Sequence, residues 1–256
     1  MKEIFVRGTS LPESYHKAIL ALHTEGDVLS CDDWNQRQKE ISMTFVVDEP
    51  LREPMVSRLY IGGYRELQQY IMEVLDGILN FKIGQGNCWP YTYNDRLVNY
   101  QKKFNQIEFI VSELKRSPDT RRAVAVIRDN DIDPFNNDAA CLQNIQYFIR
   151  EGKLQCKVLM RSNDAVEAAF MNAFAFIFLQ KSIADRVGVE IGGYTHRANS
   201  FHAYSKDFKL LEQYADGILK KPIEDITYAY QGFYDELMKE SIPEILEMVN
   251  GLPREE

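Results

Sequence analysis

A cysteine and an arginine are the first residues of this chain whose spacing indicates chemistry. Cys141 follows NNDAA and precedes LQNIQYF, so we expect it at the entry to a β-strand. Arg161 follows the next expected strand, and the short connection REGK lets the two strands pair as a hairpin. Positive charge near a thiol lowers its pKa and favours the reactive thiolate. The pair therefore indicates a nucleophilic cysteine, while a small buried residue is the alternative interpretation.

The segment RSND at 161–164 joins a strand to the start of an apolar helix. Ser162 or Asn163 would cap that helix and Asp164 suits its positive end, so these polar residues are explained without a ligand. Arg161 is not explained in this way, because a cation at a helix N-terminus is unfavourable unless an anion lies there too. Arg161 and Ser162 together therefore predict a phosphate site.

The adjacent arginines Arg121 and Arg122 open an expected strand, so their side chains should point to opposite faces of a sheet. One interpretation is a solvated arginine beside an ion-paired one. The other is a second contribution to the anion site. The residue types alone leave both open.

Three more polar side chains could contact a ligand. Asn172 is inside the apolar helix, where it is either a packing amide bonded to the backbone or a group whose donor and acceptor match the edge of a uracil ring. His202 and Tyr204 alternate with Ala203 after a strand, which puts both side chains on one face. A lone histidine is usually structural, but this pair is well placed to hold a sugar hydroxyl.

The elements that must position these residues show no internal repeat and no linker. Apolar spacing predicts helices over 11–22, 64–79, 101–115, 165–186, 205–215 and 235–250. Strands are expected over 40–47, 121–129, 145–149 and 154–160, with at least one more in 188–201. A polar loop is expected over 25–38, and an irregular glycine-rich segment over 83–89. The pattern predicts an α+β fold in a single domain, residues 1–256, with an antiparallel or mixed sheet and helices against one side.

Composition excludes several classes of protein. A formal net charge of −8 argues against a protein that binds duplex DNA, which needs a broad basic face. None of the four cysteines (Cys31, Cys88, Cys141 and Cys156) forms a CxxC pair, so no metal site is expected. No apolar run is long enough to span a bilayer, and MKEIFVRGTS lacks the apolar core of a signal peptide. We therefore expect no membrane partner and a cytoplasmic location.

Taken in order, these motifs resemble the thymidylate synthase superfamily, which includes pyrimidine nucleotide hydroxymethylases. The chain has an arginine pair before a strand (DTRRAVAV), a strand-entry cysteine with a glutamine five residues on (CLQNIQYF), GKLQCKVLMRSNDAVEAAFMNAFAF, and then NSFHAY. The resemblance covers roughly residues 90–208 and is thin before residue 90. It is closest to compact, archaeal-type members, and it implies a mixed sheet packed with helices whose free face lies at a homodimer interface.

The resemblance implies one-carbon chemistry at C5 of a pyrimidine nucleoside monophosphate. Cys141 would attack C6 of the ring, and C5 would then attack the methylene carbon of 5,10-methylenetetrahydrofolate. Tyr93, in PYTYNDRL, resembles the tyrosine that helps remove the C5 proton, and Asp164 would sit near the ring and the folate. The cofactor would therefore be this folate, with Cys141, Tyr93 and Asp164 as catalytic residues.

The remaining roles implied by the resemblance are those of substrate binding. The residues expected to hold the phosphate are Arg161 and Ser162, with Arg121 and Arg122 reaching across the dimer and Arg37 a candidate for the family's early arginine. Those expected to hold the ring and sugar are Gln146, Asn172, His202 and Tyr204.

Departures from the family pattern leave two reactions to choose between, methylation and hydroxymethylation. Leu142 stands where the family commonly has His, Met160 where it has Gln, and Phe170–Met171 where it has Pro-Phe. EMVNGLPREE has no clear match to the tail that closes over folate, which favours 5-hydroxymethylation of CMP, dCMP or dUMP. Asn172 favours a uracil ring, because cytosine-specific relatives carry Asp there. We expect thymidylate synthase-type methylation of dUMP, with hydroxymethylation as the alternative and an inactive nucleotide-binding relative as a third hypothesis.

Overall fold

A mixed seven-stranded sheet forms the centre of the computed structural model, which describes residues 1–84 and 89–253. Its order is β1-β3-β8-β7-β6-β5, with β2 paired to β3. The pairs β1–β3 and β7–β8 are parallel, and the other neighbours are antiparallel. The strand bounds are β1 Glu3–Gly8, β2 Asp27–Cys31, β3 Gln36–Val47, β5 Val124–Val126, β6 Leu142–Arg150, β7 Lys153–Asp164 and β8 Glu190–Tyr204. A separate small sheet pairs β4 (Val56–Ser57) with β9 (Thr227–Tyr228).

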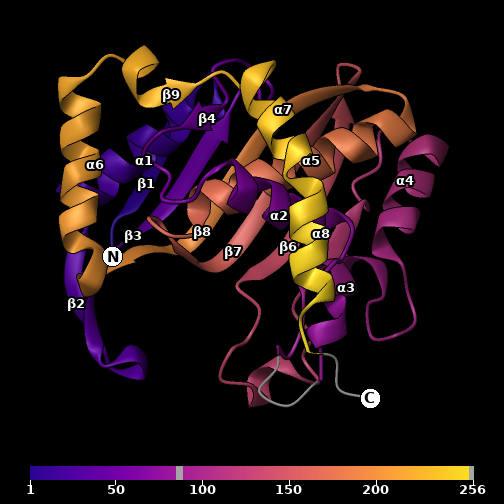
Figure 1. Cartoon of the computed structure of the whole chain (residues 1–256). Coiled ribbons are helices and arrows are strands. Elements are labelled where there is room, and N and C mark those ends of the chain that lie inside the picture. Colours follow the sequence, from indigo (N-terminus) through magenta and orange to yellow (C-terminus); the bar gives the residue numbers. More distant parts are fainter. Residues whose placement is uncertain (85–88, 254–256) are drawn as a thin grey trace.

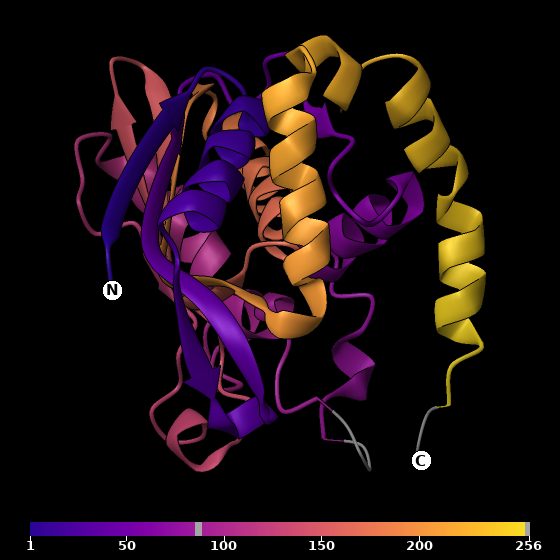
Figure 2. The ribbon, with the colours of Figure 1, turned by 90° about the vertical axis from the view of Figure 1, so that its left-hand side faces the viewer.

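Helices pack against one face of the sheet, as Figures 1 and 2 show. Their bounds are α1 Leu11–Glu25, α2 Tyr64–Leu75, α3 Tyr93–Val98, α4 Gln106–Arg116, α5 Ala169–Val187, α6 Phe208–Lys220, α7 Phe233–Glu240 and α8 Ile242–Asn250. The opposite face carries half-exposed and exposed side chains, among them Phe5 and Arg197. This confirms the predicted α+β fold with a mixed sheet and helices on one side.

The central helix α5 is apolar on nearly every side because other elements surround it. Phe170, Phe174 and Phe176 are each at most 1% exposed. It contacts α2 and α4 as well as β7 and β8. It ends at Gly188, whose φ of +88° is the left-handed conformation that glycine adopts at little cost. α5 is therefore the layer between the sheet and the outer helices, as the nearly continuous apolar run predicts.

The hairpin of β6 and β7 is confirmed, and its turn explains how Cys141 and Arg161 come together. Glu151 and Gly152 both have positive φ, at +52° and +73°, which suits a tight two-residue turn between antiparallel strands. The register then runs back along both strands and places Leu142 opposite Met160. The residues just before β6 therefore lie beside the end of β7.

Several predicted elements are wrong or shifted. The expected loop over 25–38 contains β2 and the start of β3, because these polar residues form an exposed two-stranded arm stabilised by pairing rather than by burial. The helix expected over 101–115 begins at Gln106, and the short helix α3 before it was not predicted. The helix expected over 235–250 is split into α7 and α8, with Pro243 in the first turn of α8.

The strand expected over 121–129 is reduced to Val124–Val126, so Arg121 and Arg122 precede it instead of opening it. Cys88 and part of the expected irregular segment over 83–89 lie outside the described residues. Among residues 1–84 and 89–253, no helix combines the length and apolarity needed to cross a membrane.

Candidate active site

Cys141 lies at the entry to β6, as the sequence predicts, and is held there by Arg161. The Arg161 backbone N–H donates to the Cys141 carbonyl at 2.7 Å. The Arg161 guanidinium donates to two more carbonyls of the same loop, Ala140 at 3.2 Å and Ala139 at 2.6 Å. One arginine therefore supports the backbone that presents the thiol.

The Cys141 thiol is half-buried, and its pKa reflects opposing effects. Burial raises the pKa, the charge of Arg161 lowers it, and Asp138 raises it. The net direction is upward, because desolvation disfavours the thiolate more than the single nearby guanidinium favours it. The predicted lowering of the pKa by Arg161 is present, but burial outweighs it.

The segment RSND forms the end of β7 and does not cap α5. α5 begins at Ala169, and its N-cap residue Ala168 supplies no side-chain hydrogen bond. Asp164 instead accepts the backbone N–H groups of Val166 and Glu167, both at 2.9 Å, in the turn between strand and helix. The capping role predicted for Ser162 or Asn163 is therefore wrong, because four turn residues separate the strand from the helix. The Arg161 side chain is exposed, beside the half-buried Ser162, which leaves its outer N–H groups open to an anion.

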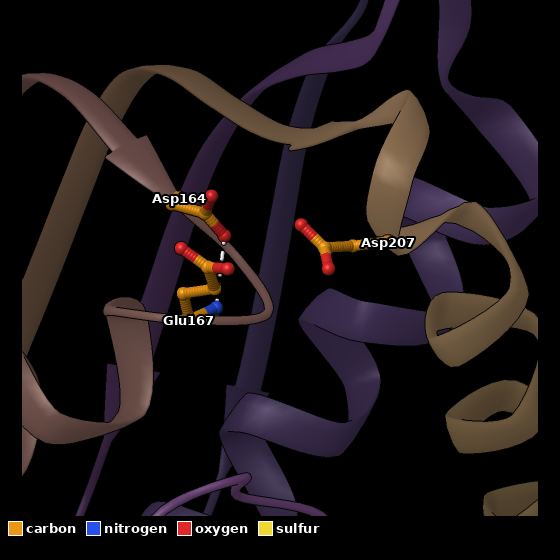
Figure 3. A group of neighbouring side chains, drawn as sticks. All are labelled: Asp164, Glu167 and Asp207. Carbon is orange, nitrogen blue, oxygen red and sulfur yellow. Dashed lines mark hydrogen bonds between the residues drawn. The ribbon is translucent and has the colours of Figure 1, made fainter.

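Three carboxylates meet at this turn, and Figure 3 shows them. Oxygens of Asp164, Glu167 and Asp207 lie within 4.8 Å of one another. Lys206 offsets this charge, because its ammonium group lies 2.6 Å from Glu167 and 3.8 Å from Asp207. Burial raises the pKa of Asp164, while its two backbone donors and His202 oppose that rise. Asp164 is thus held in a fixed orientation next to the end of β8.

His202 and Tyr204 share one face of β8, as predicted, with ring centroids 4.8 Å apart. His202 is opposite Asp164 across the β7–β8 register. Ser200 Oγ donates to Glu40, so it is free to accept from His202 Nδ1 at 3.3 Å. Burial lowers the pKa of His202 and keeps the ring neutral. The other ring nitrogen, Nε2, is then an acceptor for a hydroxyl donor.

These strand-borne residues form one group, which we call the strand wall: Cys141, Arg161, Ser162, Asp164, His202 and Tyr204. Burial raises the pKa of Tyr204 to about 12, and the charges of Asp164, Cys141 and Arg161 also act on it. Such pairwise effects require proximity, so the ends of β7 and β8 and the start of β6 converge. The sequence predicted every member of this wall.

A second group comes from α2, α3, α5 and the loop before α3, and we call it the helix wall: Tyr70, Glu73, Tyr91, Tyr93 and Asn172. Asn172 is 4% exposed in the first turn of α5, and the Tyr70 hydroxyl donates to its Oδ1. Of the two interpretations of this amide, bonding to the backbone is not the one observed, because its Oδ1 accepts from another side chain. A cavity of about 210 Å³ opens beside Tyr70 and Tyr93. It is lined by Tyr70, Glu73, Val74, Leu79, Trp89, Tyr91, Thr92, Tyr93 and Asp138.

Tyr91 and Tyr93 connect this cavity to the cysteine. Their rings lie 5.9 Å apart, and the backbones of Cys141 and Leu142 are close enough to act on the pKa of Tyr91 and of Tyr93, respectively. The pKa of Tyr93 is raised by burial and by Tyr70, Tyr91 and Cys141. The tyrosine predicted at this place is thus next to the thiol, with its hydroxyl in the protonated form.

Other predicted site residues lie apart from these walls. Gln146 donates to the Arg121 carbonyl at 2.9 Å, on the sheet face opposite the buried Ile145 and Tyr147. It is well along β6 from Cys141, so its predicted contact with the ring is not formed within this chain. Arg122 pairs with Glu113 at 2.9 Å, and Arg121 is exposed.

That arrangement of Arg121 and Arg122 matches the interpretation of one solvated and one ion-paired arginine. Arg37 is exposed near the start of β3, one residue from Gln38, which is opposite Tyr204. It therefore lies toward the strand-wall end of the sheet, whereas Arg121 and Arg122 lie near the far end of β6.

Three residues of the helix wall were missed by sequence reasoning: Tyr70, Glu73 and Tyr91. Tyr70 and Glu73 are three residues apart on α2, a spacing that puts both on one helix face. That face also carries apolar residues, so the sequence alone does not separate a core face from a cavity wall. Burial raises the pKa of Glu73, with Gln69 and Lys82 opposing the rise.

The two walls together can hold a planar, anionic ligand and act on it with a nucleophile. The strand wall offers a thiol, an exposed guanidinium and a hydroxyl acceptor. The helix wall offers an amide, tyrosine hydroxyls and a carboxyl group beside an aromatic-lined cavity. Such a set suits addition of a thiolate to a ring carbon, followed by proton transfers.

Comparison with known proteins agrees with this arrangement. A model of the thymidylate synthase family matches residues 64–227, more than half of the chain. A Methanocaldococcus jannaschii protein named "Putative thymidylate synthase" is 32% identical over 224 residues, covering 84% of this chain and 97% of its own length. A thymidylate synthase of Bacillus licheniformis is 32% identical over 125 residues, covering 48% of this chain and 44% of its own.

The fold is also that of a solved structure. Thermostable thymidylate synthase A from Bacillus subtilis superposes with a TM-score of 0.65 at 19% identity, covering 81% of this chain and 84% of that one. The sequence relatives and the family model extend the likeness beyond the fold. The chain therefore belongs to the thymidylate synthase family of one-carbon transferases.

Proposed function

We propose that this protein methylates C5 of dUMP, using 5,10-methylenetetrahydrofolate, through a covalent bond between Cys141 and C6. The observation that carries the proposal is that Tyr70 links the amide to the thiol. Its hydroxyl donates to Asn172, and Cys141 is close enough to add to the rise in the Tyr70 pKa that burial causes. In a pyrimidine ring, C6 is opposite N3, so a thiol and a base-reading amide must face each other across the ring. The proposal therefore requires Cys141 and Asn172 to face each other across the bound ring.

The strand wall provides the contacts for the rest of the nucleotide. Arg161 and Ser162 would hold the phosphate, because a guanidinium and a hydroxyl pair well with phosphate oxygens. The bound phosphate, a dianion, would then lie beside the Ala139 and Ala140 carbonyls, to which Arg161 donates. His202 Nε2 would accept a sugar hydroxyl, and Tyr204 lies beside it. Asp164 would contact the ring and the folate from the turn before α5.

The cavity of the helix wall fits the folate ring system. Trp89, Tyr91 and Tyr93 supply aromatic surface, and Glu73 and Asp138 supply acceptors for ring N–H donors. Methylenetetrahydrofolate would supply the one-carbon unit and, for methylation, the hydride. Tyr93 would take part in moving the C5 proton, because its hydroxyl is beside the Cys141 loop.

Hydroxymethylation of CMP, dCMP or dUMP is the second candidate, and Glu73 is the observation that favours it. A half-buried carboxyl group with a raised pKa lines the cavity where the exocyclic carbon would form. Such a group is suited to activating water, and water added to a methylene at C5 gives a hydroxymethyl group.

The mass of the nucleotide product tests the proposal. The protein is incubated with methylenetetrahydrofolate and dUMP, UMP, dCMP or CMP in separate reactions. A gain of one methyl group on dUMP is the expected result. A hydroxymethyl product on any of the four would replace methylation by the second candidate, and no product from any nucleotide would leave an inactive nucleotide-binding relative.

We also propose a homodimer formed by the sheet face that carries no helix in Figure 2. Arg121 and Arg122, which lie apart from Arg161 in one chain, would then reach a partner's phosphate site. Light scattering tests this, and a monomer would contradict it. The double variant Arg121→Ala/Arg122→Ala separates the two ideas, since a dimer with unchanged dUMP affinity would remove the arginines from the site.

A further inference from the structure

A hydrogen bond between the side chains of Tyr70 and Asn172 joins α2 to the amide that we propose reads the base. Tyr70 is half-buried on α2, and Asn172 is 4% exposed on α5. The Tyr70 hydroxyl donates to Asn172 Oδ1. In the part of the chain that the structure describes, Asn172 Nδ2 has no hydrogen-bond partner. The acceptor end of the amide is therefore engaged and the donor end is open.

The orientation of that amide matters because it can pair with either of two bases. A uracil ring presents N3–H and the acceptor O4, whereas a cytosine ring presents the acceptor N3 and an exocyclic amine. A side-chain amide matches the first in one orientation and the second when it is rotated by 180°. Asparagine alone therefore does not choose between these rings, and a neighbour that holds one orientation does.

Tyr70 favours the observed orientation over the rotated one. After rotation, Nδ2 would face the Tyr70 oxygen, and the hydroxyl proton would need another acceptor. Within residues 1–84 and 89–253, Asn172 is the hydrogen-bond partner found for this hydroxyl. Burial raises the pKa of Tyr70, and the charge of Glu73, one turn along α2, raises it further, so the hydroxyl stays protonated and is a donor. Rotation thus costs a hydrogen bond in a half-buried site.

We propose that Tyr70 is a positioning residue that sets base selectivity, by holding Asn172 so that Nδ2 meets O4 of a uracil ring and an exocyclic amine is disfavoured. This rests on the proposed function, because it assumes that a pyrimidine lies between Cys141 and Asn172. It also has a consequence for the reaction. Addition of the thiolate at C6 moves an electron pair through C5 and C4 onto O4, where the Nδ2–H donor stabilises the charge.

Isothermal titration of dUMP and dCMP into the wild type, Tyr70→Phe and Tyr60→Phe tests the proposal. Phenylalanine keeps the ring and removes the hydroxyl. Tyr60 is the matched control, because its hydroxyl contacts Met171, the residue before Asn172, at 3.4 Å. We expect the wild type to bind dUMP more tightly than dCMP. Tyr70→Phe should lower that preference about 3- to 10-fold, the size of one lost neutral hydrogen bond, and Tyr60→Phe should not.

An Asn172→Ala background shows whether Tyr70 acts through the amide. There the Tyr70→Phe change should leave the ratio of the two affinities unaltered. The proposal is overturned if Tyr70→Phe keeps the wild-type ratio, if it shifts the ratio equally in both backgrounds, or if the wild type prefers dCMP. In those cases product formation still decides the proposed function by itself. A wild type that binds neither nucleotide would overturn both.

Discussion

The strand wall and the helix wall of the site differ in how their residues are held. Arg161, Asp164 and His202 belong to paired strands, whose register and hydrogen bonds fix each side chain relative to the next. Tyr70 and Tyr91 come from α2 and from the loop before α3, and they reach the site only through helix packing. The strand wall carries the exposed cation, whereas Glu73 and Asp138 make the cavity of the helix wall acidic.

This difference indicates that the two walls have different roles in the reaction. A cationic wall with an ordered backbone suits the binding of an anionic nucleotide, and an acidic aromatic cavity suits a ring with N–H donors and the proton transfers of a second substrate. If the two walls have these roles, changes in the strand wall alter nucleotide affinity or the covalent step. Changes in Glu73, Tyr91 or Tyr93 of the helix wall alter turnover with nucleotide affinity retained, whereas Tyr70 and Asn172 of the same wall act on the base. The following variants test these roles.

The largest effect is expected for Cys141→Ala. Loss of the nucleophile should lower turnover by at least about 10⁴-fold while nucleotide affinity stays within a few-fold of the wild type. Product mass and titration measure the two quantities. Cys156→Ala, which removes a thiol that is 1% exposed elsewhere in the core, is the control. Turnover that survives in Cys141→Ala would show that another group is the nucleophile.

Glu73→Gln should come next, with turnover reduced about 10²-fold and nucleotide affinity unchanged. Because burial raises the pKa of Glu73, the acid limb of the wild-type pH profile should lie above the ordinary carboxyl range. Activity is lost as the pH falls through that pKa, and the limb should disappear in Glu73→Gln. Glu244→Gln, an exposed partner of Arg65, is the control. A Glu73→Gln variant that binds the nucleotide more weakly but keeps the wild-type turnover would contradict the role assigned to Glu73 in the helix wall.

Arg161→Ala should weaken dUMP binding about 10- to 100-fold and leave the affinity for the nucleoside deoxyuridine nearly unchanged. It should also raise the pH at which Cys141 reacts with iodoacetamide, because Arg161 lowers the thiol pKa that burial raises. Arg58→Ala is matched, since Arg58 also donates to a backbone carbonyl, that of Thr227, at 3.0 Å. Equal losses for nucleotide and nucleoside would indicate a folding defect rather than a phosphate contact.

The smallest effect is expected for His196, which contacts the strand that carries Ser162 and Asp164. His196 Nε2 is 2.8 Å from Oδ1 of Asn163, the residue between those two. Burial lowers the pKa of His196 to about 3. An unfolded histidine titrates near 6.5, so the unfolded state binds the proton first as the pH falls. The contribution of the neutral His196 ring to the free energy of unfolding is therefore present above pH 6.5, and it is lost as the pH falls from 6.5 to about 3.

Denaturant titrations measure that loss. The wild type should lose about 2 kcal/mol from this group between pH 6.5 and pH 5, and His196→Gln should lose that much less over the same interval. His23→Gln, at the end of α1, is the control. Equal losses in His196→Gln and the wild type would mean that this buried ring does not support the wall.

Local sequence predicted the residues of the strand wall because each of them lies close to the end of a strand. RSND, HAY and the cysteine before LQNIQYF each lie within a few residues of a strand end, and hairpin and parallel pairing bring those ends together. Gln146 shows the limit of this reasoning. Its distance from Cys141 in sequence matched a motif, but Ile145 and Tyr147 on either side of it are buried, so strand alternation puts the Gln146 side chain on the other face of the sheet.

The sequence by itself determined the family, the α+β class and the group of residues that would bind and attack a nucleotide, because those depend on residue types at short, regular spacings. Only the tertiary structure decided which side chains complete the site. Tyr70 is 102 residues from Asn172 along the chain, and their hydrogen bond exists because α2 packs on α5. The burial that raises the Cys141 pKa is likewise a property of the packed fold, since desolvation depends on all the elements around a group and not on its sequence neighbours.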